Sequence, residues 1–156
     1  MKSIVIAITG ASAMQIAERS IQVLLENDQS VDLILSKGSY EVAKSERGIN
    51  IPVEPNAQGE FWRKKLDVKS GKLTCYRWND HSASIASGSH KTKGMVIVPC
   101  SMGTLGRIAS GFSLDLIERC ADVHLKENRR LIISPRESPL SSVSYTHLTL
   151  PTIYSV

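Results

Sequence analysis

Two short segments of this chain combine a glycine with hydroxyl side chains directly after an apolar run. Residues 9–12 (TGAS) follow the run 4–8, and residues 101–104 (SMGT) come shortly after the run 94–98. A glycine lets a ligand approach the backbone closely, and the free amide groups at the start of a helix bind anions. One such segment is more often an ordinary turn than a binding site. Two of them in one small sheet favour the binding of a phosphate or of the polar edge of a ring.

A third candidate is the pair Arg136 and Glu137, which follows the apolar run 131–134. An arginine at the end of a strand can bind an anion while the neighbouring carboxylate transfers a proton. A solvent-facing ion pair on a loop explains the same two residues equally well. Arg119 and Lys126 lie two helical turns apart on roughly one face of a predicted helix, and the commoner fate of such charges is a solvated helix face.

The pattern also narrows the ligand. The segment 9–12 is not a G-x-G-x-x-G motif, and the run 31–35 is followed by Ser36 and Lys37, where an NAD-binding chain would carry an acidic residue for the ribose. No G-K-[ST] motif for a nucleoside triphosphate is found. Because Lys37 could meet a 2′-phosphate, NADP stays open. Flavin mononucleotide (FMN) fits better, since it needs one phosphate site and donors for its ring.

The elements that must position these residues are short buried strands separated by helices. The runs 4–8, 31–35, 94–98 and 131–134 are rich in β-branched residues, as is typical of strands buried on both faces of a parallel sheet. Helical spacing predicts helices between them, among them 39–47 and 114–127, the latter burying Leu114, Ile117, Ala121 and Leu125. We therefore predict a three-layer, doubly wound α/β fold with a mostly parallel sheet. Residues 56–90 are hard to interpret, apart from a candidate strand at 73–78.

Composition excludes several classes of function. The chain has 156 residues, enough for one domain, and its net charge of +4 suits a small anion as well as it suits nucleic acid. Aromatic residues make up only 5% and do not alternate with basic ones, which argues against nucleic-acid binding. The three cysteines form no C-x-x-C pair, so neither a metal site nor a disulfide framework is indicated. No apolar run is long enough to span a membrane and no signal peptide is evident, so we expect a cytoplasmic protein.

Six segments together resemble the UbiX-like flavin prenyltransferases over nearly everything from Ser3 to Ser142. They are ITGAS (8–12), LSK (35–37), ASGS (86–89), GMVIVPCSMGTL (94–105), LIERCADVHLKENRRL (116–131) and PRESPLS (135–141). The resemblance implies a Rossmann-like flavoprotein that joins a dimethylallyl group from dimethylallyl phosphate to N5 and C6 of reduced FMN, without a metal. The prenylated FMN would serve a UbiD-type decarboxylase. It also implies a large homo-oligomer, such as a dodecamer, in which neighbouring subunits complete the site.

The resemblance assigns roles residue by residue. Flavin contacts are implied for Gly10, Ala11, Ser12, Ser36, Ser101, Met102, Gly103, Thr104 and Arg136. Arg119 and Lys126 would hold the phosphate of the donor, Glu137 would act as an acid or base, and Glu46 would be a second carboxylate at the site. The chain departs from the family at Ala13, where a glycine is usual.

The end of the chain has a different composition. From residue 138 to residue 156 there is no Asp, Glu, Lys or Arg, and the last strand and helix of the family pattern are not found there. We therefore expect a flavin-binding α/β domain over 1–142 and an atypical tail over 143–156, foreign to the domain or disordered. Tyr145, His147 and Tyr154 are not assigned the donor-binding roles that the family gives to residues in this region.

Two alternatives stay open at this point. A flavin-dependent cysteine decarboxylase would share the fold and cofactor, but its Asn-rich and Met-containing motifs and a matching active-site histidine are not found in this sequence. A non-catalytic FMN-binding or assembly subunit is the other. The tail does not match the part of the family pattern that binds the donor. The sequence therefore supports flavin binding better than turnover.

Overall fold

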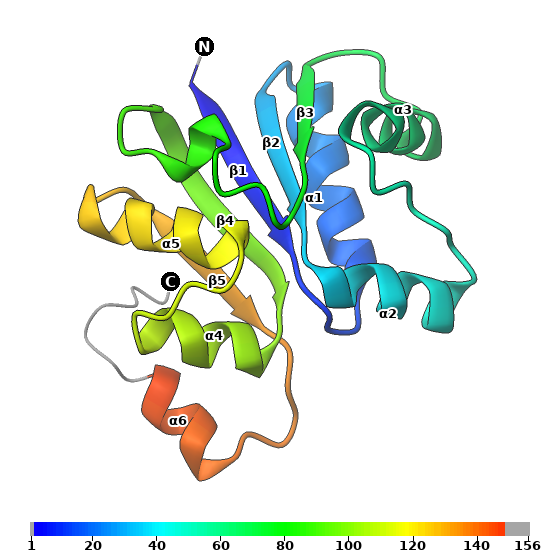
Figure 1. Cartoon of the computed structure of the whole chain (residues 1–156). Helices are drawn as coiled ribbons and strands as arrows, with labels where there is room; N and C mark the ends of the chain where they lie inside the picture. The colour runs from blue at the N-terminus through cyan, green and yellow to red at the C-terminus, as the bar shows by residue number, and fades with distance from the viewer. Residues whose placement is uncertain (1, 149–156) are drawn as a thin grey trace.

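A computed structural model describes residues 2–148, and within them five parallel strands form one sheet in the order β3-β2-β1-β4-β5 (Figure 1). The strands are β1 (Ser3–Ile8), β2 (Ser30–Leu35), β3 (Lys72–Tyr76), β4 (Thr92–Cys100) and β5 (Leu131–Pro135). The four strands predicted from apolar runs are confirmed, and the candidate strand at 73–78 is β3. The fold class is confirmed as a doubly wound α/β sheet.

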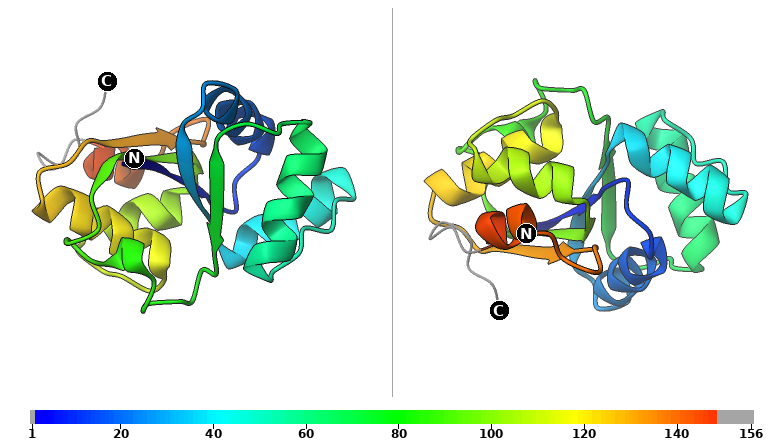
Figure 2. Two further views of the ribbon diagram at one scale, coloured as in Figure 1. Left: turned by 90° about the horizontal axis from the view of Figure 1, so that it is seen from above. Right: turned by 90° about the horizontal axis from the view of Figure 1, so that it is seen from below.

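Helices cover both faces of the sheet (Figure 2). They are α1 (Met14–Glu26), α2 (Lys37–Arg47), α3 (Pro55–Leu66), the short 3₁₀ helix η1 (Ser84–Ala86), α4 (Met102–Ala109), α5 (Leu116–Lys126) and α6 (Ser142–Leu148). Side chains of α1, α2 and α3 form one buried cluster with Ile6 and Ile8, whereas η1, α4 and α5 form another with Val5 and Ala7. Successive residues of β1 thus serve opposite faces, as strand geometry requires.

The order of the strands fixes where a ligand can bind. From β1 the chain moves to β2 and then β3 on one side, while from β4 it moves to β5 on the other. The winding therefore reverses between β1 and β4, which are neighbours with parallel pairing. In open α/β sheets the ligand site lies beyond the carboxyl ends of the strands at such a reversal.

Two sequence-based details are corrected by the structure. Leu114 does not belong to the buried face of α5: it is 59% exposed and precedes the helix, which begins at Leu116. The reason is that the Asp115 carboxylate caps the helix by accepting from the amides of Ile117 and Glu118. In addition, α3 was not predicted at all.

The tail is only partly described. Residues 142–148 form α6, which contacts α4, whereas residues 149–156, including Tyr154, lie outside the described residues. In the described part of the chain no helix is long and apolar enough to cross a membrane.

Ala13, the residue before α1, has a left-handed backbone conformation with φ 78° and ψ 37°. A side chain in this conformation costs about 1 to 2 kcal/mol, a cost that glycine does not have. Glycine would remove this strain but would also gain freedom in the unfolded chain, which opposes folding. The net effect of replacing Ala13 by glycine is therefore expected to be a rise of about 0.5 to 1 kcal/mol in the free energy of unfolding. Urea denaturation measures this change.

The matched control is Ala57→Gly in α3, at an exposed position with ordinary helical conformation. It is expected to lower the free energy of unfolding by about 0.5 to 1 kcal/mol. Destabilisation by Ala13→Gly would show that the left-handed conformation carries no strain.

Candidate functional site

Thr9 joins the two glycine-hydroxyl segments at the reversal point. Its hydroxyl donates to the carbonyl of Pro99 at 2.8 Å and accepts from the amide of Ser101 at 2.7 Å, and its own amide donates to Pro99 at 3.2 Å. Thr9 is completely buried. The segments 9–12 and 101–104, which are far apart in the sequence, therefore lie side by side at the carboxyl edge of the sheet.

A cavity of about 390 Å³ opens at this edge. Its lining consists of Gly10, Ala11, Ser12, Val42, Glu46, Ser101, Met102, Arg136 and Glu137. All of these except Val42 are site residues predicted from the sequence. Val42 precedes Glu46 by one turn of α2, so its position on the same helix face could have been derived from the i, i+4 spacing.

Both carboxylates at the cavity are held by a serine. Glu46 accepts a hydrogen bond from the hydroxyl of Ser12 at 2.6 Å, and Glu137 accepts one from the hydroxyl of Ser144 in α6. Ser12 does not cap α1, although a serine close before a helix often does, because the cap residue is Ala13 and no side chain bonds to that helix end. The hydroxyl of Ser12 instead holds a carboxylate of α2.

Ser101 is the cap of α4 and accepts from the amide of Thr104 at 3.4 Å. Thr104 itself is buried, and Gly103 is exposed on the first turn of the helix, so neither lines the cavity. Ser36 caps α2 in the same way, accepting from Ser39 at 3.2 Å. It lies at the same edge of the sheet, since its amide donates to the carbonyl of Ile8, but it does not line the cavity either.

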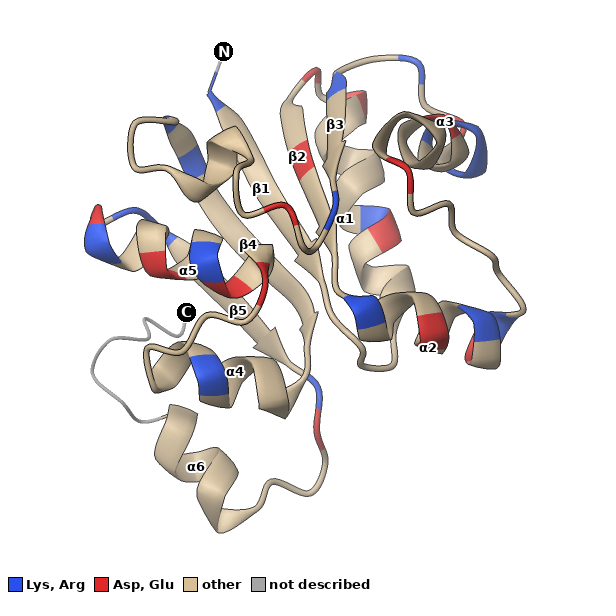
Figure 3. Ribbon diagram, in the orientation of Figure 1, with Lys and Arg blue, Asp and Glu red and all other residues tan. Residues whose placement is uncertain are grey.

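Arg119 and Lys126 are not brought to the cavity. Both belong to α5, along which acidic and basic residues alternate (Figure 3). Arg119 pairs with Asp122 at 3.1 Å, and Lys126 is exposed in the last turn of the helix. Within one copy of the chain, therefore, the cavity contains one of the predicted cations, Arg136.

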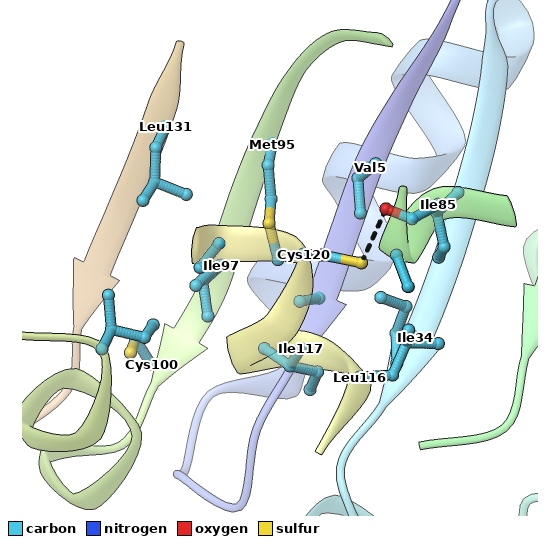
Figure 4. Close-up of a cluster of buried hydrophobic side chains, with 14 of the residues drawn as sticks. Val5, Ile34, Ile85, Met95, Ile97, Cys100, Leu116, Ile117, Cys120 and Leu131 are labelled. Carbon is cyan, nitrogen blue, oxygen red and sulfur yellow. Dashed lines mark hydrogen bonds between the residues drawn. The ribbon is translucent and has the colours of Figure 1, made fainter. Parts of the chain in front are cut away.

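Cys100 immediately precedes the second segment but is not a nucleophile. It is completely buried among apolar side chains such as Ile97 and Ile117 (Figure 4). Burial raises the pKa of its thiol to about 12, so the thiolate is not formed at neutral pH.

Gly10 is required for packing as well as for access. A Cβ added at Gly10 would lie 3.0 to 3.2 Å from the backbone of Gly38 at the start of α2. The two glycines thus allow α2, which carries Glu46, to approach the loop that carries Ser12.

This contact predicts an asymmetry between the two glycines. Gly10→Ala is expected to cost about 1 to 3 kcal/mol of stability, because its methyl group would press against backbone that cannot move freely. Gly38→Ala is the matched control, since its Cβ would meet the Cα of Gly10 at 3.5 Å and the Gly10 nitrogen at 3.9 Å, both ordinary contacts. Thermal unfolding of the two variants tests the difference, and equal losses would contradict it.

The geometry fits FMN. The N-terminus of α4 and the loop of residues 10–12 line a single polar cavity, where free backbone amides can bind an anion, and Arg136 adds a cation beside them. The two carboxylates on the walls supply groups that can accept a proton. Within residues 2–148 no group of three or more His, Cys, Asp or Glu side chains is placed to hold a metal ion.

Known proteins place this fold and site in one class. The family model described as Flavoprotein matches residues 1–148. The flavin prenyltransferase UbiX of Synechocystis sp. is 47% identical over 147 residues, which is 94% of this chain and 71% of that protein. The flavin prenyltransferase UbiX of Pseudomonas aeruginosa is 39% identical over 140 residues, covering 90% of this chain and 67% of that protein.

Solved structures agree. The crystal structure of AnUbiX in complex with FMN and dimethylallyl pyrophosphate matches with a TM-score of 0.79 at 35% identity, over 94% of this chain and 71% of that one. A dodecameric FMN-dependent UbiX-like decarboxylase from Escherichia coli matches with a TM-score of 0.78 at 31% identity, over 95% and 72% of the two chains. The chain therefore belongs to the flavoprotein family, and within it to the UbiX flavin prenyltransferases.

Proposed function

We propose that this protein transfers a dimethylallyl group from dimethylallyl phosphate to N5 and C6 of reduced FMN. The observation that carries the proposal is the cavity at the β1–β4 reversal. It collects both glycine-hydroxyl segments, Arg136 and two carboxylates from four separate parts of the sequence. AnUbiX, a relative of this protein, was crystallised with FMN and dimethylallyl pyrophosphate.

In this proposal the amides and hydroxyls of residues 10–12 and 101–102 bind the phosphate and the ring edge of FMN, with Arg136 as the cation. Reduced FMN would supply the electron-rich atoms to which the allyl group is joined. Glu137 takes the proton that must leave when the second bond closes the new ring, and Glu46 is the second carboxylate. Ser12 and Ser144 orient these two carboxylates.

The departing phosphate needs cations that stabilise its developing negative charge. Arg119 and Lys126 do not line the cavity of their own copy. We propose that they act in the cavity of a neighbouring copy, in a homo-oligomer like that of the dodecameric relative from Escherichia coli. This arrangement explains how residues on the outer face of α5, away from the cavity of their own copy, can belong to the site.

The product of this reaction is proposed to serve a UbiD-type decarboxylase, and the protein to work in the cytoplasm. The three cysteines are unpaired and buried, as suits a reducing compartment. We further propose that residues 1–142 form the flavin-binding unit and that residues 143–156, with their uncharged composition, are an atypical tail, from which Ser144 contacts Glu137.

Incubation with reduced FMN and either dimethylallyl phosphate or the pyrophosphate tests the activity. A flavin that is heavier by one prenyl unit in mass spectrometry is the expected product. Unchanged flavin that stays bound would instead support a non-catalytic FMN-binding subunit, an alternative favoured by the absence of Arg119 and Lys126 from the cavity of a single copy.

A further inference from the structure

Glu118 of α5 is a buried carboxylate that the proposed chemistry does not use. Its side chain is only 1% exposed. One carboxylate oxygen accepts from the amides of Leu114 at 2.6 Å and Asp115 at 3.4 Å, and the other forms an ion pair with the Nε of Arg107. The amide bonds are ordinary capping of α5. Capping alone, however, does not require the arginine.

Arg107 connects this carboxylate to the first turn of α4. Its Nη2 donates to the hydroxyl oxygen of Thr104 at 3.3 Å, and that oxygen lies 3.0 Å from the hydroxyl of Ser101, which lines the cavity. The guanidinium has no lone pair to offer, so it can only donate. The guanidinium thus occupies one lone pair of the Thr104 oxygen and leaves the proton of Thr104 free to point to Ser101.

The direction of this chain determines what Ser101 can do. Its oxygen accepts from the amide of Thr104 at 3.4 Å and lies 3.0 Å from the hydroxyl oxygen of Thr104, and either of these two hydroxyls can be the donor. When Thr104 donates, the proton of Ser101 is left to donate toward the cavity. Hydrogen bonds in such a chain polarise one another, and a donating group at the end of it binds an acceptor oxygen more strongly.

Gly103 explains how the arginine fits. A Cβ at this position would lie 3.3 Å from Nη1 of Arg107, so the missing side chain gives the guanidinium room beside the start of α4. This gives Gly103 and Thr104 a role although neither lines the cavity.

We propose that Arg107 and Glu118 are positioning residues that hold Ser101, through Thr104, as a hydrogen-bond donor to an acceptor oxygen of bound FMN. The inference rests on the FMN binding of the proposed function. The oxygen belongs either to the phosphate or to the ring edge. Riboflavin, which lacks the phosphate, distinguishes the two.

The test is the affinity of Arg107→Met for FMN, measured by quenching of flavin fluorescence. We expect the Kd to rise about tenfold, the equivalent of one lost charge-supported hydrogen bond. Arg107→Lys keeps the charge without the planar fork, so it should recover part of the affinity. If the oxygen is on the ring, riboflavin binding weakens equally and the absorption band of the bound flavin shifts. If it is on the phosphate, riboflavin binding is unchanged.

The matched control is Arg63→Met. Arg63 also holds a structural position, donating to the carbonyls of Val68, Ser70 and Gly71, but it does not line the cavity. Both variants are expected to lower the melting temperature, whereas only Arg107→Met should weaken FMN binding. Equal effects of the two variants on the Kd would overturn the proposal.

Amide hydrogen exchange in the flavin-free protein provides a readout that does not depend on the proposed function. Arg107→Met should speed exchange at Thr104 and Leu105, whereas Arg63→Met should not. Unchanged exchange there would overturn the inference even in a protein that binds flavin. A wild-type protein that binds no flavin would overturn the proposed function and, with it, the role of Ser101 as a donor to FMN.

Discussion

Glu137→Gln is expected to lower the rate of prenyl transfer by about two to three orders of magnitude, the contribution of a well-placed proton-transfer group. The glutamine keeps the size of the side chain and an oxygen that can accept from Ser144, but it cannot take up a proton. FMN binding should therefore be unchanged within error. The rate of formation of the heavier flavin, followed by mass spectrometry, measures the effect.

Glu41→Gln is the control for this variant, because Glu41 is an exposed residue of α2 that does not line the cavity. It should leave the rate unchanged. A Glu137→Gln protein of full activity would show that another group, such as the departing phosphate, takes the proton.

A second large effect is expected from Arg119→Met, which removes a cation that we place in the cavity of a neighbouring copy. Alone, this variant should lose about two to three orders of magnitude of activity, because the charge of the leaving phosphate is no longer compensated. FMN binding should remain, since Arg119 does not line the FMN cavity of its own copy.

Coexpression with Glu137→Gln then tests the shared site. In mixed oligomers roughly a quarter of the sites combine an intact Glu137 with an intact neighbouring Arg119, so activity should return although each variant alone is inactive. The mixture is isolated with two different affinity tags. A mixture that stays inactive would show that Arg119 and Glu137 act at the site from the same copy, and full activity of Arg119→Met alone would exclude Arg119 from the reaction.

The central part of the fold could be predicted because its signals are local and strong. Each of the four buried strands is a continuous apolar run, and their alternation with helices leaves few topologies. The helix α3 was missed because only Gln58, Trp62 and Leu66 of it are buried, so its apolar pattern is weak. Pro55, a residue that usually interrupts helices, is the first residue of this helix, where its missing amide has no cost.

The site was predictable only in part, because only some of its contacts follow from the order of the strands. Residues at the ends of neighbouring parallel strands meet whatever the rest of the chain does, so Gly10, Ser101 and Arg136 could be placed together from the sequence. Contacts made across helices could not. The partner of Ser12 is on α2, and the ion pair of Arg107 joins two helices whose relative position no local pattern determines.

Thr9 sets a limit on the redesign of this enzyme for other flavins or donors. One hydroxyl bonds to groups at the end of β4 and at the start of α4. Thr9→Val would keep the shape of the side chain, but the Ser101 amide would lose its acceptor and the Pro99 carbonyl would lose one of its two donors. A mutant library that varies residues 10–13 together with 101–104 therefore needs to hold position 9 constant. Otherwise most of its members would lose the relative placement of the two loops before any new specificity could be selected.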